Sequence, residues 1–244
     1  MNSDYRRTSA GYFRDSSTLL YSYLICIPLL LLYEFLILIS QPDAEYLVRI
    51  SVDAWFKMIF GSLGFNALSA TFFIAAVAGA VILWRDRYQL KKLKYRYFFL
   101  MLLESLFLAV ILAIGISFLL QSILMAASGS SLQELSRLQL IALSLGAGLY
   151  EELFFRVILV SFLLWIFKKV FTHKGAANAS AVILAALCFS AVHYIGEFGD
   201  PFTLGSFLFR FLFGLALNLI YVIRGFGMAA WTHAIYDILV IMSR

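Results

Sequence analysis

Long apolar runs, separated by short polar or basic stretches, make up most of the chain. About 20 consecutive apolar residues are enough for an α-helix to cross the hydrocarbon core of a bilayer. Seven runs reach or approach this length, at residues 18–40, 64–84, 97–125, 138–167, 177–195, 202–223 and 226–242. The pattern predicts an all-α fold, a polytopic membrane helix bundle of about seven transmembrane helices, or eight if a further span or re-entrant segment is present.

Residues 45–60 differ from these runs because charged residues are spaced among the apolar ones. This pattern is typical of an amphipathic helix that lies at the membrane interface. The whole chain, residues 1–244, is expected to form a single membrane domain. Within it, residues 1–137 would supply three spans and the interfacial helix, and residues 138–242 the remaining spans.

Composition supports a membrane protein, since 63% of the residues are hydrophobic and 14% are charged, against about 25% charged in a soluble domain. Lys and Arg gather between the apolar runs and concentrate on the cytoplasmic side of membrane proteins. Thirteen fall on one predicted side (Arg6, Arg7, Arg14, Arg85, Arg87, Lys91, Lys92, Lys94, Arg96, Lys168, Lys169, Lys174 and Arg224) and four on the other (Arg49, Lys57, Arg137 and Arg244). The N-terminus is therefore expected in the cytoplasm. Topology accounts for the net charge of +5, so the lipid bilayer and not nucleic acid is the expected partner.

Several ionisable side chains lie inside the apolar runs of the C-terminal half. A charge at the bilayer centre costs at least about 2.5–3.5 kcal/mol on insertion scales, so such residues are candidates for function. They occur in three short patterns, EELFFR, FSAVH and HAIYD, which contain Glu151, Glu152, Arg156, His193, His233 and Asp237.

The first pattern, EELFFR, divides its two carboxylates. Glu152 and Arg156 are four residues apart, the preferred helical spacing for an ion pair with the acid first. Glu151 lies about a quarter-turn away and is less able to share that arginine, which leaves it available as a general base. A purely structural ion pair that fastens this helix to its neighbours remains an equally open interpretation.

The other two patterns place residue pairs one helical turn apart. Phe189 would pack beside His193, although a single histidine near a helix end can be purely structural. His233 and Asp237 have the spacing for an aspartate that orients a histidine, or for two ligands of one metal ion. One general base with two imidazoles and a carboxylate is what amide hydrolysis requires, because water is deprotonated, the oxyanion stabilised and the leaving amine protonated.

The ordered set of motifs resembles the CAAX-protease and bacteriocin-processing family, which includes the type II CAAX prenyl endopeptidases and the Abi proteins. The family pattern is EExxxR, then FxxxH, then HxxxN or HxxxD on successive membrane helices, and all three occur here in order. The resemblance covers roughly residues 138–242, which would be the catalytic core. The first 137 residues resemble the family only in being helical membrane segments.

The resemblance implies a glutamate-dependent intramembrane endopeptidase. Glu151 would activate water, with His193 also holding it, and His233 with the residue at 237 would form the oxyanion site. Family members with Asn at the last position avoid a difficulty that Asp237 raises, because an ionised carboxylate would repel an oxyanion. Asp237 must therefore be protonated, orient His233 or bind a metal. A zinc ion held by His193 and His233 stays open, and no other cofactor is expected.

The expected substrate is a membrane-associated peptide or protein, and the resemblance favours a bacterial inner, or plasma, membrane without implying a prenylated substrate. Two other functions remain open. One is a proton- or ion-coupled transporter, against which no inverted repeat is evident. The other is a non-catalytic scaffold or bacteriocin-immunity protein.

Two further features lead to structural expectations. Glu34, Glu104 and Arg210 lie within apolar runs, and pairing of one of these acids with Arg210 is the simplest way to bury them. The small residues in LSLGAGLY at 143–150 should let a neighbouring helix approach closely. Such an approach would bring the histidine-bearing helices within reach of Glu151.

Overall fold

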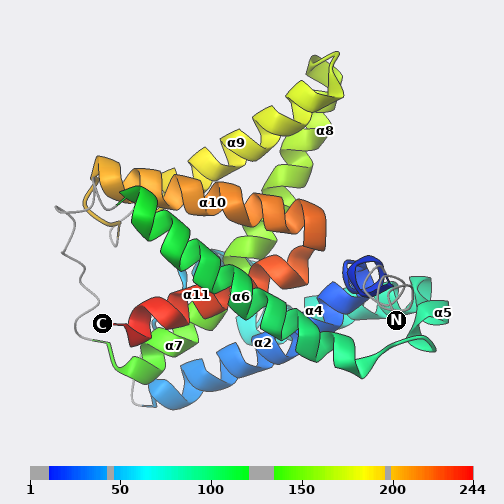
Figure 1. Cartoon of the computed structure of the whole chain (residues 1–244). Helices are drawn as coiled ribbons and strands as arrows, with labels where there is room; N and C mark the ends of the chain where they lie inside the picture. Colours follow the sequence, from blue (N-terminus) through cyan, green and yellow to red (C-terminus); the bar gives the residue numbers. More distant parts are fainter. Residues whose placement is uncertain (1–10, 43–46, 121–134, 196–198, 244) are drawn as a thin grey trace, which may run out of the picture.

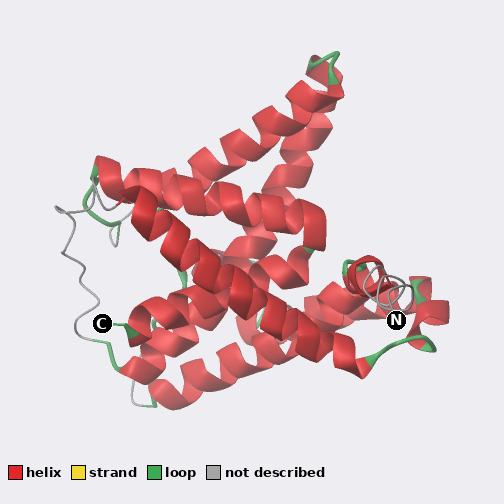
Figure 2. Cartoon of the chain, viewed as in Figure 1, coloured by secondary structure: helices red, strands yellow, loops and turns green. Residues whose placement is uncertain are grey.

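The computed structural model describes residues 11–42, 47–120, 135–195 and 199–243, and all regular structure within these ranges is helical (Figure 2). The first half contains α2 (Leu19–Ser40), α3 (Ser51–Ser62), α4 (Ala67–Arg85), α5 (Arg87–Leu90) and α6 (Tyr95–Leu120). The second half contains α7 (Arg137–Gly146), the π-helical segments η2 (Ala147–Glu151) and η3 (Leu153–Val160), α8 (Ser161–Val170), α9 (Lys174–Val192), α10 (Leu204–Arg224) and α11 (Phe226–Met242).

The predicted helices are confirmed, with small shifts at their ends. The last apolar run, 226–242, is α11 without any change of bounds, and α3 begins at Ser51 within the predicted interfacial segment. Part of that segment (45–46) and the end of the third run (121–125) lie outside the described residues. Four described helices are long and apolar enough to cross a membrane, at Leu19–Ser40, Tyr95–Ile116, Lys174–Val192 and Leu204–Arg224. The apolar helices Ala70–Arg85 and Phe226–Met242 are shorter, so the count of seven or eight spans stays a prediction.

The fourth apolar run forms one continuous helical stretch from α7 to α8. It begins with a capping box, in which the Ser136 side chain accepts from the Gln139 backbone N–H and the Gln139 side chain accepts from the Ser136 backbone N–H. The stretch then departs from α-helical geometry at η2 and η3, where π-helical turns replace the usual ones. Such turns are rare and occur often at functional sites. Here they include Glu151, the last residue of η2, and lie on either side of Glu152.

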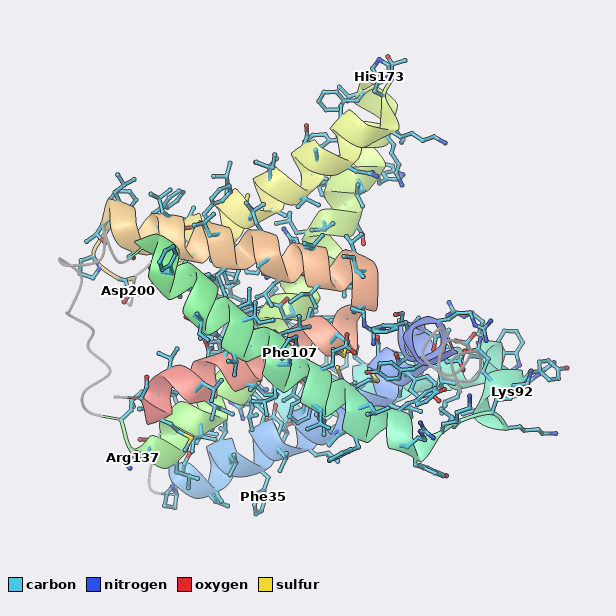
Figure 3. The ribbon with its side chains drawn as sticks, in the orientation of Figure 1. Phe35, Lys92, Phe107, Arg137, His173 and Asp200 are labelled. Carbon is cyan, nitrogen blue, oxygen red and sulfur yellow. The ribbon has the colours of Figure 1, made fainter. Side chains whose placement is uncertain are left out.

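Helix α11 lies at the centre of the bundle, in contact with α2, α6, α7, α10 and both π-helical segments. Figure 1 shows α6 crossing over α11, while α8 and α9 form a hairpin that projects from the body and α10 runs beside α9. Helix α5 lies on one side of the molecule, and the end of α11, Arg137 and Asp200 lie on the opposite side (Figures 1 and 3). Apolar side chains such as Phe35 and Phe107 remain on the outside, as expected of a surface that faces lipid.

Small residues allow η2 to approach α11 as the sequence predicted. Ala230 and Ala234 on α11 are fully buried, and they pack directly on Gly148. A Cβ atom at Gly148 would lie 2.4 Å from the Ala230 carbonyl oxygen and 2.7 Å from the Ala234 Cβ. The turn into α11 also requires glycine, because Gly225 has a φ of 88°, which side chains disfavour. Together these glycines fix the helix that carries His233 against the helix that carries Glu151.

The prediction that Glu34 or Glu104 pairs with Arg210 was wrong. Glu34 pairs with Arg49 at 2.9 Å and with Lys57 at 2.7 Å. Glu104 pairs with Arg224 at 2.6 Å, and Arg210 pairs with Asp200. The prediction compared only residues within the apolar runs. The partners lie outside those runs, where long basic side chains such as Arg49, Lys57 and Arg224 reach the buried acids while their stems cover apolar surface.

Candidate active site

Glu152 is the centre of the polar site. Its Oε2 atom lies 2.9 Å from Arg156 Nε, and both side chains are fully buried. This confirms the pairing expected from the four-residue spacing. Its Oε1 atom lies 2.8 Å from Nδ1 of His233, on α11. The second contact was not predicted, and it makes Glu152 the link between the first and third motifs.

His233 is held between two carboxylates. A carboxylate paired with arginine can only accept hydrogen bonds, so His233 donates from Nδ1 to Glu152. Its other nitrogen, Nε2, lies 3.5 Å from Oδ2 of Asp237, one turn further along α11. The expected pairing of His233 with Asp237 is therefore present. Asp237 is placed to orient the ring, which is one of the three roles that the sequence left open.

Glu151 ends η2 directly beside Glu152 and is 6% exposed. Within the described part of the chain, the hydrogen bonds and ion pairs of this acidic pair are formed by Glu152 and none by Glu151. The geometry thus distinguishes Glu152, whose two oxygens each have a partner, from Glu151, which has none among the described residues.

His193 lies at the C-terminal end of α9. Its Nδ1 atom is 2.8 Å from the Phe189 carbonyl oxygen one turn earlier. A carbonyl oxygen can only accept, so Nδ1 carries the hydrogen and the lone pair of the neutral ring is on Nε2. Among the described residues no hydrogen bond joins His193 to the other motif side chains, and its place in the site is defined by packing.

The Phe189 ring provides that packing. Its centroid lies 5.1 Å from the His193 ring and 6.1 Å from the His233 ring. Arg156 places its guanidinium carbon 4.6 Å from the same centroid, a distance at which the ring face attracts a cation. Phe189 therefore lies beside both histidines and the buried arginine, as predicted for His193 alone.

Other aromatic side chains complete the wall, and sequence reasoning missed them. The Phe213 ring lies 5.0 Å from His233 and 4.5 Å from Tyr236, and the Phe155 ring lies 5.1 Å from Phe189. These residues are ordinary apolar positions in the sequence and gave no signal of their own. Their effect is to exclude water from around the charged groups, which strengthens every electrostatic interaction between them.

The zinc site that the spacing left open would need a third protein ligand beside the two histidines. Within the described ranges, no group of three or more His, Cys, Asp or Glu side chains is arranged to hold a metal ion.

Comparisons with known proteins agree with the geometry. Residues 133–239 match a family model described as type II CAAX prenyl endopeptidase Rce1-like. No curated protein and no solved structure matches the chain. The matched segment contains all six motif residues and the helices that position them, whereas α2 to α6 lie outside it. Apolar helices together with this match indicate an integral membrane protein, and residues 133–239 are similar to the type II CAAX prenyl endopeptidases.

Proposed function

We propose that the chain is an intramembrane endopeptidase that hydrolyses peptide bonds in membrane-associated peptides or proteins, with Glu151 activating the attacking water. One observation carries the proposal. Both oxygens of Glu152 are engaged, one by Arg156 and one by His233, so the adjacent buried Glu151 is the carboxylate available for proton transfer. The family match supports a protease.

Water activation is assigned to Glu151 and His193. Glu151 accepts a proton from water, and the lone pair on His193 Nε2 accepts a hydrogen bond from the same water and orients it. The water oxygen then attacks the carbonyl carbon of the scissile bond. A general base placed in this way contributes about 10²- to 10⁴-fold to the rate.

Stabilisation of the oxyanion is assigned to His233. With Nδ1 held by Glu152, the protonated ring donates from Nε2 to the developing negative charge, and Asp237 keeps the ring in that orientation. A donor aimed at the oxyanion in a dry site is worth more than in water. The proton taken up by Glu151 then passes to the leaving amine, and the peptide bond breaks.

The membrane orientation belongs to the same proposal, with the N-terminus in the cytoplasm of a bacterial cell. The basic loop after α5 lies beside the first described residues of the chain, with Lys94 Nζ 3.6 Å from Asp15 Oδ2. A test replaces Cys26 and Cys188 with Ala and introduces Lys91→Cys or Ser243→Cys. In intact cells an impermeant maleimide should label position 243 and not position 91. Labelling only at position 91 would show that the protein has the opposite orientation in the membrane.

The function is tested with purified protein in phospholipid vesicles and a library of N-palmitoylated peptides, with products read by mass spectrometry. Glu151→Gln should lower kcat by about 10²- to 10⁴-fold while thermal unfolding stays unchanged. Asp15→Asn makes the same chemical change at a partly exposed carboxylate and should keep full activity. Equal cleavage by the wild type and Glu151→Gln, or no cleavage by the wild type, would contradict the proposal.

A further inference from the structure

Arg210 is a cation on the face of α10 that lines the site. It lies three residues before Phe213 and four before Gly214, so the three residues share one helical face. Phe213 packs on His233. A Cβ atom at Gly214 would lie 3.0 Å from the Phe189 ring. The face of α10 that carries Arg210 therefore packs against His233 and against Phe189, whose ring packs on His193.

The guanidinium of Arg210 is held by one residue of its own helix and by two residues of the segment that follows α9. It donates from Nη1 to the Tyr194 hydroxyl at 2.7 Å and to Ser206 Oγ at 2.8 Å, and from Nη2 to the Asp200 carboxylate. Tyr194 follows His193 directly. The Asp200 backbone N–H donates to the His193 carbonyl at 2.9 Å. The cation is thus anchored to the segment that directly follows His193.

Arg210 differs from the buried arginines Arg156 and Arg224 in its exposure and in the exposure of its counter-ion. The Arg156 side chain is fully buried against Glu152, and Arg224 is 7% exposed and donates from two nitrogens to both oxygens of Glu104. Arg210 is 19% exposed, and its counter-ion Asp200 is 37% exposed and accepts through Oδ2. A guanidinium has a planar fork suited to a carboxylate, and an exposed counter-ion is the one most easily exchanged for another carboxylate.

Resting on the proposed function, we propose that Arg210 binds a carboxylate of the substrate peptide in place of Asp200, and that it selects peptides that carry this group near the scissile bond. The carboxylate is the C-terminal group of the peptide or an acidic side chain. Because Arg210 lies beside His193, binding there also fixes the peptide relative to the activated water.

The experiment uses one N-palmitoylated peptide that the library assay identifies, prepared in three forms. The first ends in a free carboxylate, the second in a carboxamide, and the third in a carboxamide with a Glu at the preceding position. The wild type should cleave the first about ten- to a hundredfold more efficiently than the second, mainly through KM, as expected for a charge-assisted hydrogen bond. Arg210→Gln should remove this preference, so that the ratio of kcat/KM between the first and second forms falls to about one. Recovery with the third form assigns the site to any peptide carboxylate, and no recovery assigns it to the C-terminal one.

Two results would overturn the proposal. One is equal kcat/KM for the three peptides with the wild type. The other is an equal loss for all three in Arg210→Gln, which would indicate a structural role. Arg210→Gln/Asp200→Asn removes both charges and serves where the single variant folds poorly. Asp200→Asn alone should lower KM for the carboxylate peptide, because it removes the internal competitor.

A binding measurement separates this inference from the proposed function. The three peptides are titrated into Glu151→Gln protein and into Glu151→Gln/Arg210→Gln protein, where cleavage does not interfere. If the wild type cleaves no peptide of the library, one library peptide is prepared in the same three forms, and a binding preference for its carboxylate form that is lost with Arg210 still supports the site. Equal binding of all forms to both proteins refutes it.

Discussion

The two halves of the molecule bury their charges in different ways. In the N-terminal half, Glu34 and Asp53 each contact both Arg49 and Lys57 at 2.6–2.9 Å, and the side chains are at most 12% exposed. This N-terminal network is closed, because each acid has two bases and each base has two acids. In the C-terminal half the corresponding chain of contacts runs from Arg156 through Glu152 and His233 to Asp237, and Glu151 stays outside it.

This difference distinguishes a structural role for the buried charges of the N-terminal half from the catalytic role that we propose for Glu151 in the C-terminal half. A closed set of buried charges is fully compensated and can only hold helices together, whereas an uncommitted carboxylate can exchange a proton. The two regions also touch. The Tyr150 hydroxyl donates to Glu34 at 3.2 Å, and the Tyr33 ring packs on the Tyr150 ring. The N-terminal network therefore braces η2 at the residue before Glu151.

The largest expected effect is on stability at Glu152. Glu152→Gln leaves the Arg156 guanidinium buried without its counter-ion, and breaking a buried pair in this way costs about 3–5 kcal/mol. Glu151→Gln removes no ion pair among the described residues and should change the free energy of unfolding far less. Unfolding by SDS in mixed micelles measures both variants. The reverse ranking would show that the two acids have been assigned the wrong roles.

A smaller loss is expected in the N-terminal network. Asp53→Asn weakens charge-assisted hydrogen bonds from Tyr33, Arg49 and Lys57, at a cost of about 2–3 kcal/mol. The kcat of the folded fraction should not change, because the network supports the site without contacting substrate.

The matched control for Asp53→Asn is the double variant Asp53→Asn/Lys57→Gln, which also removes a basic partner. It should be more stable than the sum of the two single losses predicts, since contacting residues are not additive. A fall in kcat with stability retained would mean that the network takes part in catalysis.

Contacts within one helix were predictable from the sequence, and those between helices were not. The pairs Glu152–Arg156 and His233–Asp237 follow from the four-residue period alone, and the bounds of α11 follow from its apolar run. The contact between Glu152 and His233 joins residues 81 apart. It depends on how two helices rotate and cross, which local spacing does not encode. The π-helical turns around Glu151 likewise leave no mark in the hydrophobic pattern.

The charges of the remaining helices show the same limit. The sequence identified Glu34, Glu104 and Arg210 as costly to bury and in need of partners. It did not identify those partners, because Arg49, Lys57, Asp200 and Arg224 all lie outside the seven apolar runs. Their reach is set by side-chain length and by the course of the chain outside the spans.

Close packing of η2 on α11 brings together the pairs that form within each helix and so allows the contact between helices, Glu152–His233. Gly148→Ala should destabilise the protein by about 2 kcal/mol, as expected for overpacking, because the added Cβ meets the Ala230 carbonyl at 2.4 Å. Any shift of α11 also moves His233 away from Glu152, so activity should fall as well. Gly115→Ala on α6 is the matched control, since a Cβ there has no neighbour within 4 Å. Equal effects of the two changes would contradict close packing at Gly148.

The smallest expected effect concerns the start of α7. The Ser136 hydroxyl accepts from the Gln139 N–H at 3.2 Å, whereas α3 begins after Ile50 without a side-chain cap. Ser136→Ala should cost about 1 kcal/mol, and Ser136→Asp should restore it because a carboxylate also caps a helix N-terminus. Unfolding in mixed micelles would detect the loss, and kcat should stay unchanged because the cap lies four turns from Glu151 at about 3.6 residues per turn. A loss of kcat without a loss of stability would mean that the start of α7 positions Glu151 directly. The same residues would then both stabilise the C-terminal half and take part in catalysis.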